Sequence, residues 1–284
     1  MTDVIIVNKK KKSVKSIICQ TLLHVVLIIS LLMVMLPLFI MVIDAFKTGS
    51  MYDIDKWFPA LPIRISNIAD AFFALKGYIL NTLIVAVAGI SGMVFLSAMA
   101  AFSMAKLKFV GSRVAFGMIL LITMLPGILS LTPQLLLYKS LGLDNNLFAL
   151  ILPMWTGGTV WGVFLLSGFF RGLPNEIFEA ADIDGASSFQ KFVIIGLPLS
   201  MPIIATLVIM QITGVWGDYM WPKIILRPEK YTIAAGLTFV YEASSVSQTL
   251  KYAGYLLSSI PVVLLFVFFN RFYVEGLASS GIKL

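Results

Sequence analysis

Few side chains in this sequence could carry out covalent or acid–base chemistry. The chain has one cysteine, Cys19, and one histidine, His24, among its 284 residues. A single cysteine cannot form an internal disulfide or a multi-cysteine metal site. With no second histidine and no nucleophile beside a base, the sequence predicts neither a catalytic site nor a metal site, and we expect a protein that is not an enzyme. We expect His24 to make a hydrogen bond between packed helices, and a proton relay is the alternative.

One cluster of acidic residues lies between two very apolar segments. It is carried by "EAADIDGASSFQKFVIIGLPL", Glu179 to Leu199, which follows "RGLPNEIF". Pro174 suits a first helical position, and Asn175 can act as a cap. Glu176 and Glu179 place negative charge near the positive end of a helix. These residues predict that a short helix begins here.

A second short helix is predicted after the first. Gly185 accepts the left-handed backbone that ends a helix, and Ser187 is placed to cap the next one. Pro198 then constrains the direction in which the following apolar run begins. Two short helices meeting at a glycine corner bury too little apolar area to stand alone. We therefore expect this element to dock on another surface.

The charge of the element indicates what kind of surface receives it. A helix lying on lipid is rich in Lys and Arg on its polar face. This element instead offers Glu176, Glu179, Asp182 and Asp184. Because an anionic lipid surface repels acidic groups, a protein partner is favoured over an amphipathic linker resting on lipid.

A second group of residues combines aromatic rings with polar side chains, as sugar-binding sites do. Sugars require aromatic faces and side chains that both donate and accept hydrogen bonds. The candidates are Asn81, Gln134, Trp155, Gln211, Trp216, Asp218, Tyr219 and Trp221. Anchoring of Trp and Tyr at a membrane interface, or amides that join helices, would explain each residue as well. We expect two of the set to contact a ligand.

The composition indicates which elements position these groups. The chain is 59% apolar and only 12% charged, which excludes a soluble surface. Six runs contain no Asp, Glu, Lys or Arg, and each can cross the ~30 Å hydrocarbon layer as a helix. They are Ser16 to Ile43, Gly77 to Ala105, Val114 to Tyr138, Asn145 to Phe170, Phe192 to Gly217 and Tyr252 to Asn270. The runs are too long for barrel strands, so the sequence predicts an all-α, polytopic membrane protein with six transmembrane helices.

The distribution of basic residues predicts the orientation. With both termini cytoplasmic, twelve of the 21 Lys and Arg residues lie inside, at higher density than outside. The excess of basic residues that gives the net charge of +7 is then explained by the orientation in the membrane and by contact with anionic lipid. We therefore expect no nucleic-acid partner. The expected divisions are a basic cytoplasmic tail (1–15), a first helix with an external loop (16–75), a transmembrane domain (76–271) that contains a cytoplasmic loop (171–198), and a cytoplasmic tail (272–284).

Prolines and glycines interrupt two of the predicted spans. Pro126 and Pro133 lie in the third span, and Pro153, Gly157 and Gly158 lie in the fourth. Such residues free backbone groups that must then face protein or a watery path. A substrate route and ordinary kinked packing are equally favoured interpretations.

In the loops, "WFPALPIRISNI" predicts an extended or surface-lying segment, and Pro222 and Pro228 predict that no continuous helix spans 218–251.

The acidic element resembles the signature loop of inner-membrane permease subunits of ATP-binding-cassette importers. That loop reads E-A-A, three residues, G, nine residues, I, one residue, L-P. The matching residues are Glu179, Ala180, Ala181, Gly185, Ile195, Leu197 and Pro198. The similarity runs from about Lys76 onward and is greatest to the smaller permease of maltose-type carbohydrate importers. The end, "RFYVEGLASSGIKL", is similar to the tail of those subunits, although Ser280 and Leu284 depart from the commoner pattern.

The resemblance implies a type I importer permease fold and a set of partners. The loop, with Glu176 and Asp184 beside the motif, would couple the chain to an ATPase. The chain has no G-x-x-x-x-G-K-[ST] phosphate loop, so we expect it to hold no cofactor, with ATP and Mg bound by two separate ATPase subunits. A second related permease and an external solute-binding protein would complete the complex. The cargo would be a carbohydrate, with an oligosaccharide expected, and the location a bacterial or archaeal cell (inner) membrane.

Two alternatives to a sugar permease are weighed against it. The same machinery could carry amino acids, metals or phosphate instead of a sugar. An ion- or proton-coupled carrier would need charged residues within its spans, and the six runs have none.

The long outer loop 218–251, with Trp221, Tyr231 and Tyr241, is the candidate contact for the binding protein. An aromatic belt at the lipid interface is the other interpretation of these rings.

Overall fold

The structure is a computed structural model that describes residues 14–107, 109–242 and 246–281, with backbone alone for 14–17 and 270–281. Within these residues every regular element is a helix. The predicted all-α class is therefore confirmed. Residues 1–13 of the predicted basic tail and residues 282–284 of the predicted C-terminal tail, Leu284 included, lie outside the described residues.

The helices follow one another along the chain with short connections. They are α1 (Val14–Ala45), α2 (Gly49–Ile54), α3 (Ser66–Phe102), η1 (Ser103–Leu107), α4 (Ser112–Thr123), η2 (Gly127–Ser130), α5 (Leu131–Ser140), α6 (Phe148–Pro153), η3 (Met154–Gly158), α7 (Thr159–Gly172), α8 (Glu176–Ile183), α9 (Ser188–Gln190), η4 (Lys191–Gly196), α10 (Leu197–Leu199), α11 (Met201–Gly217), α12 (Met220–Ile225), η5 (Pro228–Lys230), α13 (Ile233–Glu242) and α14 (Gln248–Gly281). Of these, η1, η3 and η4 are π-helices.

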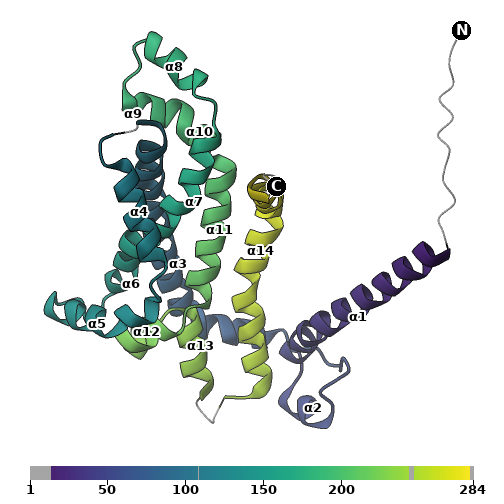
Figure 1. Cartoon of the computed structure of the whole chain (residues 1–284). Coiled ribbons are helices and arrows are strands. Elements are labelled where there is room, and N and C mark those ends of the chain that lie inside the picture. Colours follow the sequence, from purple (N-terminus) through teal and green to yellow (C-terminus); the bar gives the residue numbers. More distant parts are fainter. Residues whose placement is uncertain (1–13, 108, 243–245, 282–284) are drawn as a thin grey trace, which may run out of the picture.

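The long helices form a bundle with two distinct ends (Figure 1). Helix α3 is central and packs against α7, α11 and α14. Helices α8, α9 and α10 cover one end, which we call the α8 end, and α5, α12 and α13 lie at the opposite, α13 end. The two groups of residues singled out in the sequence thus map to different parts of the bundle.

The six predicted spans are found as four continuous helices and two bent pairs. Four helical stretches are long and apolar enough to cross a membrane. The other two spans are pairs of helices, bent by 90° between α4 and α5 and by 72° between α10 and α11. The described residues therefore contain six spans when each bent pair is counted as one.

The third span breaks where one of its two prolines was expected to interrupt it. Pro126 lies in the gap between α4 and η2, because it has no N–H to continue the α4 ladder. The interruption expected at Pro133 was wrong. That residue lies in the first turn of α5, where a missing N–H costs no intrahelical bond.

The fifth span starts later than the sequence predicted. The apolar run from Phe192 was expected to be one helix, but the chain turns at Ser200 and α11 begins at Met201. The Ser200 N–H donates back to the carbonyls of Gly196 and Leu197, at 3.1 Å each, which closes the preceding turn. Residues before Ser200 therefore belong to the α8 end.

The first outer loop is shorter than the sequence predicted. Helix α3 starts at Ser66, not near Gly77, so the "SNI" at the end of the expected extended segment is helical. Residues 59–65 before it form no regular element. Acidic and basic residues at Asp70 and Lys76 made this part of α3 look like a loop, although exposed helix tolerates both.

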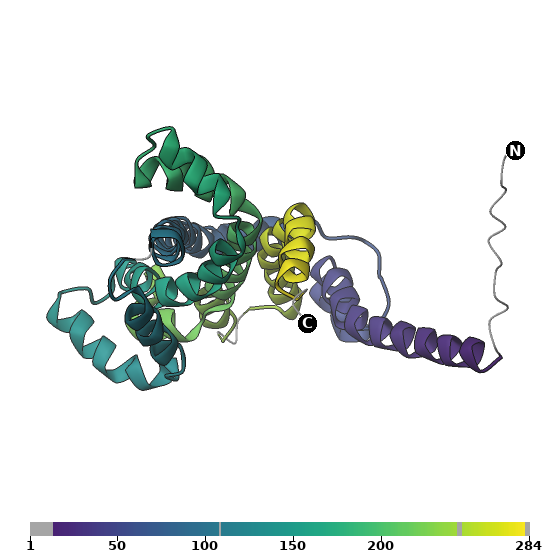
Figure 2. The ribbon, with the colours of Figure 1, turned by 45° about the horizontal axis from the view of Figure 1, so that its top comes forward.

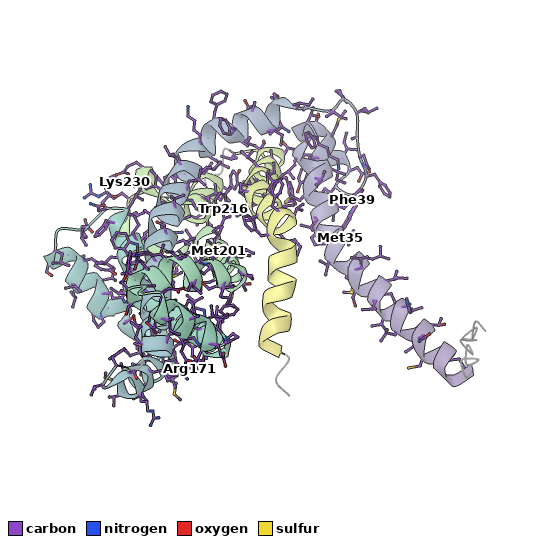
Figure 3. All side chains as sticks on the ribbon, turned by 90° about the horizontal axis from the view of Figure 1, so that it is seen from above. Met35, Phe39, Arg171, Met201, Trp216 and Lys230 are labelled. Carbon is purple, nitrogen blue, oxygen red and sulfur yellow. The ribbon has the colours of Figure 1, made fainter. Side chains whose placement is uncertain are left out.

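Helix α1 leaves the bundle and is attached at one end (Figures 2 and 3). Met35 and Phe39, in the C-terminal half of α1, are 45% and 49% exposed. The attachment centres on an ion pair between Asp44 and Lys47 at 2.7 Å, with both side chains 0% exposed. Lys47 Nζ also donates to the Asp55 carbonyl at 2.9 Å. Asn67 of α3 donates to the Ala45 and Lys47 carbonyls at 3.0 and 2.9 Å, and these two bonds join the end of α1 to α3.

The Asp44–Lys47 pair generates a stability prediction. Lys47→Met leaves the Asp44 carboxylate buried without a counter-charge, which typically costs about 3–5 kcal/mol. We expect a clear fall in the thermal unfolding midpoint of the detergent-solubilised protein. The double variant Asp44→Asn/Lys47→Met should recover most of the loss, because the remaining buried groups are neutral. Equal midpoints for the single and double variants would contradict this account.

Candidate functional site

The acidic element forms the two short helices predicted from the sequence. Helix α8 ends at Ile183, and Gly185 two residues later has a φ of +76°, in the left-handed region. Ser187 then caps α9, and its side chain and that of Gln190 form a reciprocal capping box. The glycine corner and the Ser187 cap are therefore confirmed.

The start of α8 differs from the prediction. Pro174 precedes the helix, and Asn175 occupies the N-cap position without a side-chain cap bond. Its Oδ1 atom instead accepts a hydrogen bond from Lys106 Nζ at 2.9 Å. A basic side chain from a distant part of the sequence thus replaces local capping as the partner of Asn175.

Four aromatic rings hold the element on the bundle. Phe178 of α8, Phe192 of η4 and Phe170 of α7 surround Phe102, the last residue of α3, and we call these four residues the Phe102 cluster. The ring centroids of the other three lie 5.7, 5.5 and 5.6 Å from that of Phe102. All four side chains are buried. The cluster fixes α8 and η4 against the ends of α3 and α7.

The residues of the sequence motif divide between this seat and the outer surface. Ala181 is buried, and Ile195 and Leu197 pack against the Phe102 cluster. Glu176, Glu179, Ala180, Asp184, Gly185 and Pro198 are exposed. Two apolar side chains of the element are exposed as well, Ile183 of α8 at 88% and Phe189 of α9 at 61%. We call Glu176, Glu179, Ala180, Ile183, Asp184 and Phe189 the docking surface.

An ion pair closes the element on itself. Lys191 of η4 contacts Asp182 of α8 through Nζ and Oδ1, at 2.5 Å. The lysine side chain is 11% exposed and the aspartate 58%. Of the four acids counted in the sequence, Asp182 is therefore used internally, and the other three remain on the surface.

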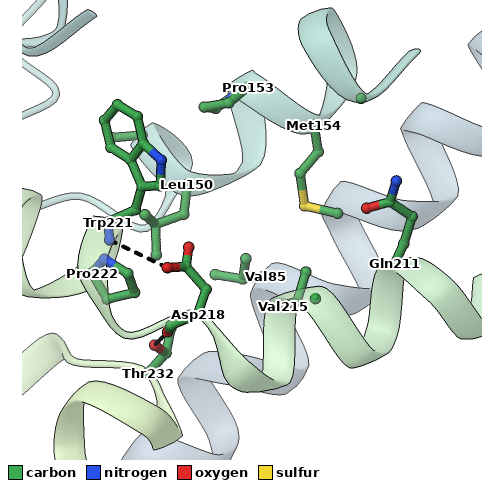
Figure 4. Close-up of a pocket in the computed structure, with 13 residues that line it drawn as sticks. Val85, Leu150, Pro153, Met154, Gln211, Val215, Asp218, Trp221, Pro222 and Thr232 are labelled. Carbon is green, nitrogen blue, oxygen red and sulfur yellow. Dashed lines mark hydrogen bonds between the residues drawn. The ribbon is translucent and has the colours of Figure 1, made fainter. Parts of the chain in front are cut away.

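Two hollows lie within the bundle, toward the α13 end. The first, about 230 Å³, has polar lining from Gln211, Asp218 and Thr232 (Figure 4). The second, about 670 Å³, opens at the break between α4 and α5 and includes Gln134, Trp161 and Trp221. We call them the Asp218 hollow and the Gln134 hollow. Pro153, Gly158 and Trp221 line both, so the two are neighbours.

Polar atoms in these hollows are incompletely paired. One Asp218 oxygen accepts a hydrogen bond from the Trp221 N–H at 3.3 Å (Figure 4). Burial raises the pKa of this carboxyl, which directly follows α11, and the N–H groups of Trp221 and Met220 oppose the shift. Gln134 Oε1 is buried and has no hydrogen-bond partner among the described residues. Its free acceptor is suited to a hydroxyl or amide donor from a ligand.

The structure brings together half of the aromatic and polar candidates. Gln134, Gln211, Asp218 and Trp221 line the hollows. The other four lie elsewhere: Asn81 donates to the Tyr231 carbonyl at 3.1 Å, Trp155 to the Ala88 carbonyl at 3.0 Å, and Trp216 to the Ser258 carbonyl at 2.8 Å, while Tyr219 is 52% exposed. Trp155 and Trp216 therefore join helices, in place of the membrane anchoring that was the other interpretation of these rings, and Asn81 joins α3 to the segment between η5 and α13.

Close helix packing explains the position of Trp155. Gly92 of α3 lies against the indole, and a Cβ added there would be 2.3 Å from Trp155 Nε1. The glycine lets α3 and η3 approach, and the indole turns onto the α3 backbone. Sequence reasoning missed Trp161, which lines the Gln134 hollow four residues after Gly157. The position of Trp161, one helical turn after Gly157 and Gly158, was the feature of the sequence that could have identified it.

Two tyrosines proposed as a contact for a binding protein are buried. Tyr231 and Tyr241 are each 7% exposed. Tyr231 packs against Phe239, and Tyr241 packs against Tyr255 and lies across Gly254 of α14. The expected contact through these two rings is therefore wrong, because they belong to the core of the α13 end. The loop does lack a continuous helix, as predicted, and consists of α12, η5 and α13.

Among the residues that the structure describes, the hydrogen bond of His24 stays within its own helix. Its Nδ1 lies 2.6 Å from the Gln20 carbonyl, one turn earlier in α1, and the contact is exposed. The expected hydrogen bond between helices is thus replaced by one within α1.

Comparisons with known proteins agree with this arrangement. Residues 93–277 match the family model described as "Binding-protein-dependent transport system inner membrane component". The chain is 31% identical over 277 residues to the probable ABC transporter permease protein YurM of Bacillus subtilis, covering 97% of this chain and 92% of that protein. It is 30% identical over 270 residues to the maltodextrin transport system permease protein MalD of Streptococcus pneumoniae, covering 93% and 95%.

A solved structure shares the fold. A chain of a bacterial ABC transporter involved in the import of the acidic polysaccharide alginate superimposes with a TM-score of 0.84 at 20% identity, covering 93% of this chain and 100% of that one. The apolar helices and the family description place the chain in the inner membrane as a multi-pass protein. The chain belongs to the family of inner-membrane components of binding-protein-dependent transport systems.

Proposed function

We propose that this chain is one permease subunit of an ATP-driven importer for a neutral oligosaccharide. The observation that carries the proposal is the docking surface, an acidic and apolar face held rigidly on the Phe102 cluster at one end of a membrane bundle. A relative named for maltodextrin transport supports the sugar class. The expected orientation puts the α8 end in the cytoplasm.

The docking surface is assigned to a cytoplasmic ATPase. Ile183 and Phe189 are too exposed to contribute to this chain's core, yet they lie among carboxylates that an anionic lipid surface repels. An apolar centre rimmed by charge is typical of a protein interface. Two ATPase subunits would bind the ATP and Mg, and this chain would carry no cofactor and no catalytic group. It would transmit their motion.

The two hollows are assigned to the wall of the cargo path. Trp161 and Trp221 offer aromatic faces, and Gln134, Gln211 and Asp218 offer hydrogen-bonding groups. Neither lining contains a basic side chain among the described residues, so an acidic sugar would find no counter-charge there. A second permease would close the path, and an external binding protein would deliver the sugar at the α13 end.

Purification of the intact complex tests the whole proposal. The chain is isolated in mild detergent, co-eluting chains are identified, and ATPase activity is measured over a panel of neutral and acidic sugars. We expect ATPase activity that rises only with a sugar-loaded binding protein. Ion-gradient-driven transport by this chain alone in liposomes would overturn the proposal.

A substitution in the docking surface tests its role. Ile183→Asp places a charge at the apolar centre of the surface, where a buried contact is worth about 1–2 kcal/mol. We expect about a tenfold loss of ATPase subunits that co-purify with the permease, and an equal loss of uptake. Val110→Asp, in the turn between η1 and α4 where the side chain is fully exposed, is the control and should retain both. Equal retention of the ATPase by the two variants would remove the docking surface from the interface.

A substitution in the Gln134 hollow tests the cargo path. Gln134→Leu removes a buried acceptor that has no partner among the described residues, so stability should be unchanged or higher. If the acceptor meets a sugar hydroxyl, uptake per ATP hydrolysed should fall by about tenfold, since one hydrogen bond is worth about 1–1.5 kcal/mol. Ser140→Ala, on the same helix, is the control. Unchanged uptake by the Gln134 variant would exclude this residue from the path.

A further inference from the structure

Lys106 contacts the chain at the point where α7 ends and α8 begins. It lies in η1, four residues after Phe102, and is half-buried. Its ammonium donates to the Leu173 carbonyl at 2.7 Å and to Asn175 Oδ1 at 2.9 Å. The same nitrogen lies 5.0 Å from the centroid of the Phe178 ring.

These three contacts fix how the end of α7 meets the start of α8. Leu173 is the C-cap of α7, Asn175 is the N-cap of α8, and Phe178 is the buried ring of α8. The carbonyls at the end of α7 carry partial negative charge, which favours a cation there. An ammonium has three donors and no acceptor, so it can satisfy the carbonyl and the amide oxygen together.

The lysine makes directed hydrogen bonds, which the rings of the Phe102 cluster cannot make. The four rings hold α8 by apolar packing, which is non-directional, and they make no directed bond to its first turn. Charge-assisted hydrogen bonds depend on angle and distance, and they fix the orientation in which α8 starts. The Asp182–Lys191 pair meanwhile ties α8 to η4, so the element moves as one unit.

We propose that Lys106 is a positioning residue that locks α8 to α3 and thereby couples movement of the docking surface to the cargo path. The proposal rests on the function proposed above. Helix α3 is 37 residues long and carries Val85, which lines the Asp218 hollow. A rotation imposed on α8 therefore reaches the hollow through one continuous helix.

The experiment uses the complete complex of both permeases, the ATPases and the binding protein. Lys106→Met keeps the aliphatic stem and removes the cation. Uptake per ATP hydrolysed should fall by about tenfold, whereas the ATPase subunits should still co-purify, because the docking surface is unchanged. Lys106→Arg restores two donors and the ring contact, and should recover most of the coupling. Arg113→Met, which removes an exposed cation seven residues later, is the matched control and should behave as wild type.

A second pair of variants keeps the test decisive if Lys106→Met fails to assemble. Asn175→Ala removes one exposed acceptor and should lower uptake per ATP by two- to threefold, and Asn175→Asp should retain it. The role of Lys106 would be overturned if both Lys106→Met and Asn175→Ala kept wild-type uptake per ATP. If the lysine variant does not assemble, wild-type uptake per ATP in Asn175→Ala would overturn it. An equal loss in Arg113→Met would overturn it too, because loss of any cation would then suffice. A wild-type complex without sugar-stimulated ATPase activity would instead refute the proposed function.

Discussion

The burial of Phe102 is the constraint on which the α8 end depends. Helix α8 has eight residues and buries Phe178 and Ala181, far too little to hold its position alone. Rings from α3, α7, α8 and η4 meet at one point, and each aromatic contact adds about 0.5–1.5 kcal/mol beyond the area buried. Gly196 is part of the same packing, since a Cβ there would lie 3.0 Å from the Phe102 ring.

A rigid seat on one side leaves a defined surface on the other. Because Phe178 and Ala181 face the bundle, the helical period turns Glu179, Ala180 and Ile183 outward. The short E-A-A segment thus serves both sides of α8, with Ala181 inside and Ala180 outside. A larger residue at Ala181 would push α8 away from the bundle, which gives a physical reason for a small residue at that position.

Features set by local chemistry could be predicted from the sequence, and features set by packing could not. Charge-free length revealed the spans, and Gly185 and Ser187 marked the corner because left-handed backbone and capping are properties of single residues. The positions of Asn81, Trp155 and Trp216 depend on which carbonyl of a distant part of the chain lies within reach. Lys106 was counted only as an inside charge, because its partners Leu173 and Asn175 are 67 and 69 residues away.

The interrupted helices converge on the same place. The break at Pro126, the π-helix after Pro153 and the short helix that carries Trp221 all border the Gln134 hollow. A broken helix inside a membrane leaves backbone groups that need water or polar partners, so breaks accumulate where a hydrated path runs. Ordinary kinked packing would instead fill the space beside each break. The Gln134 hollow lies where these three interruptions meet, as expected for the cargo path proposed above.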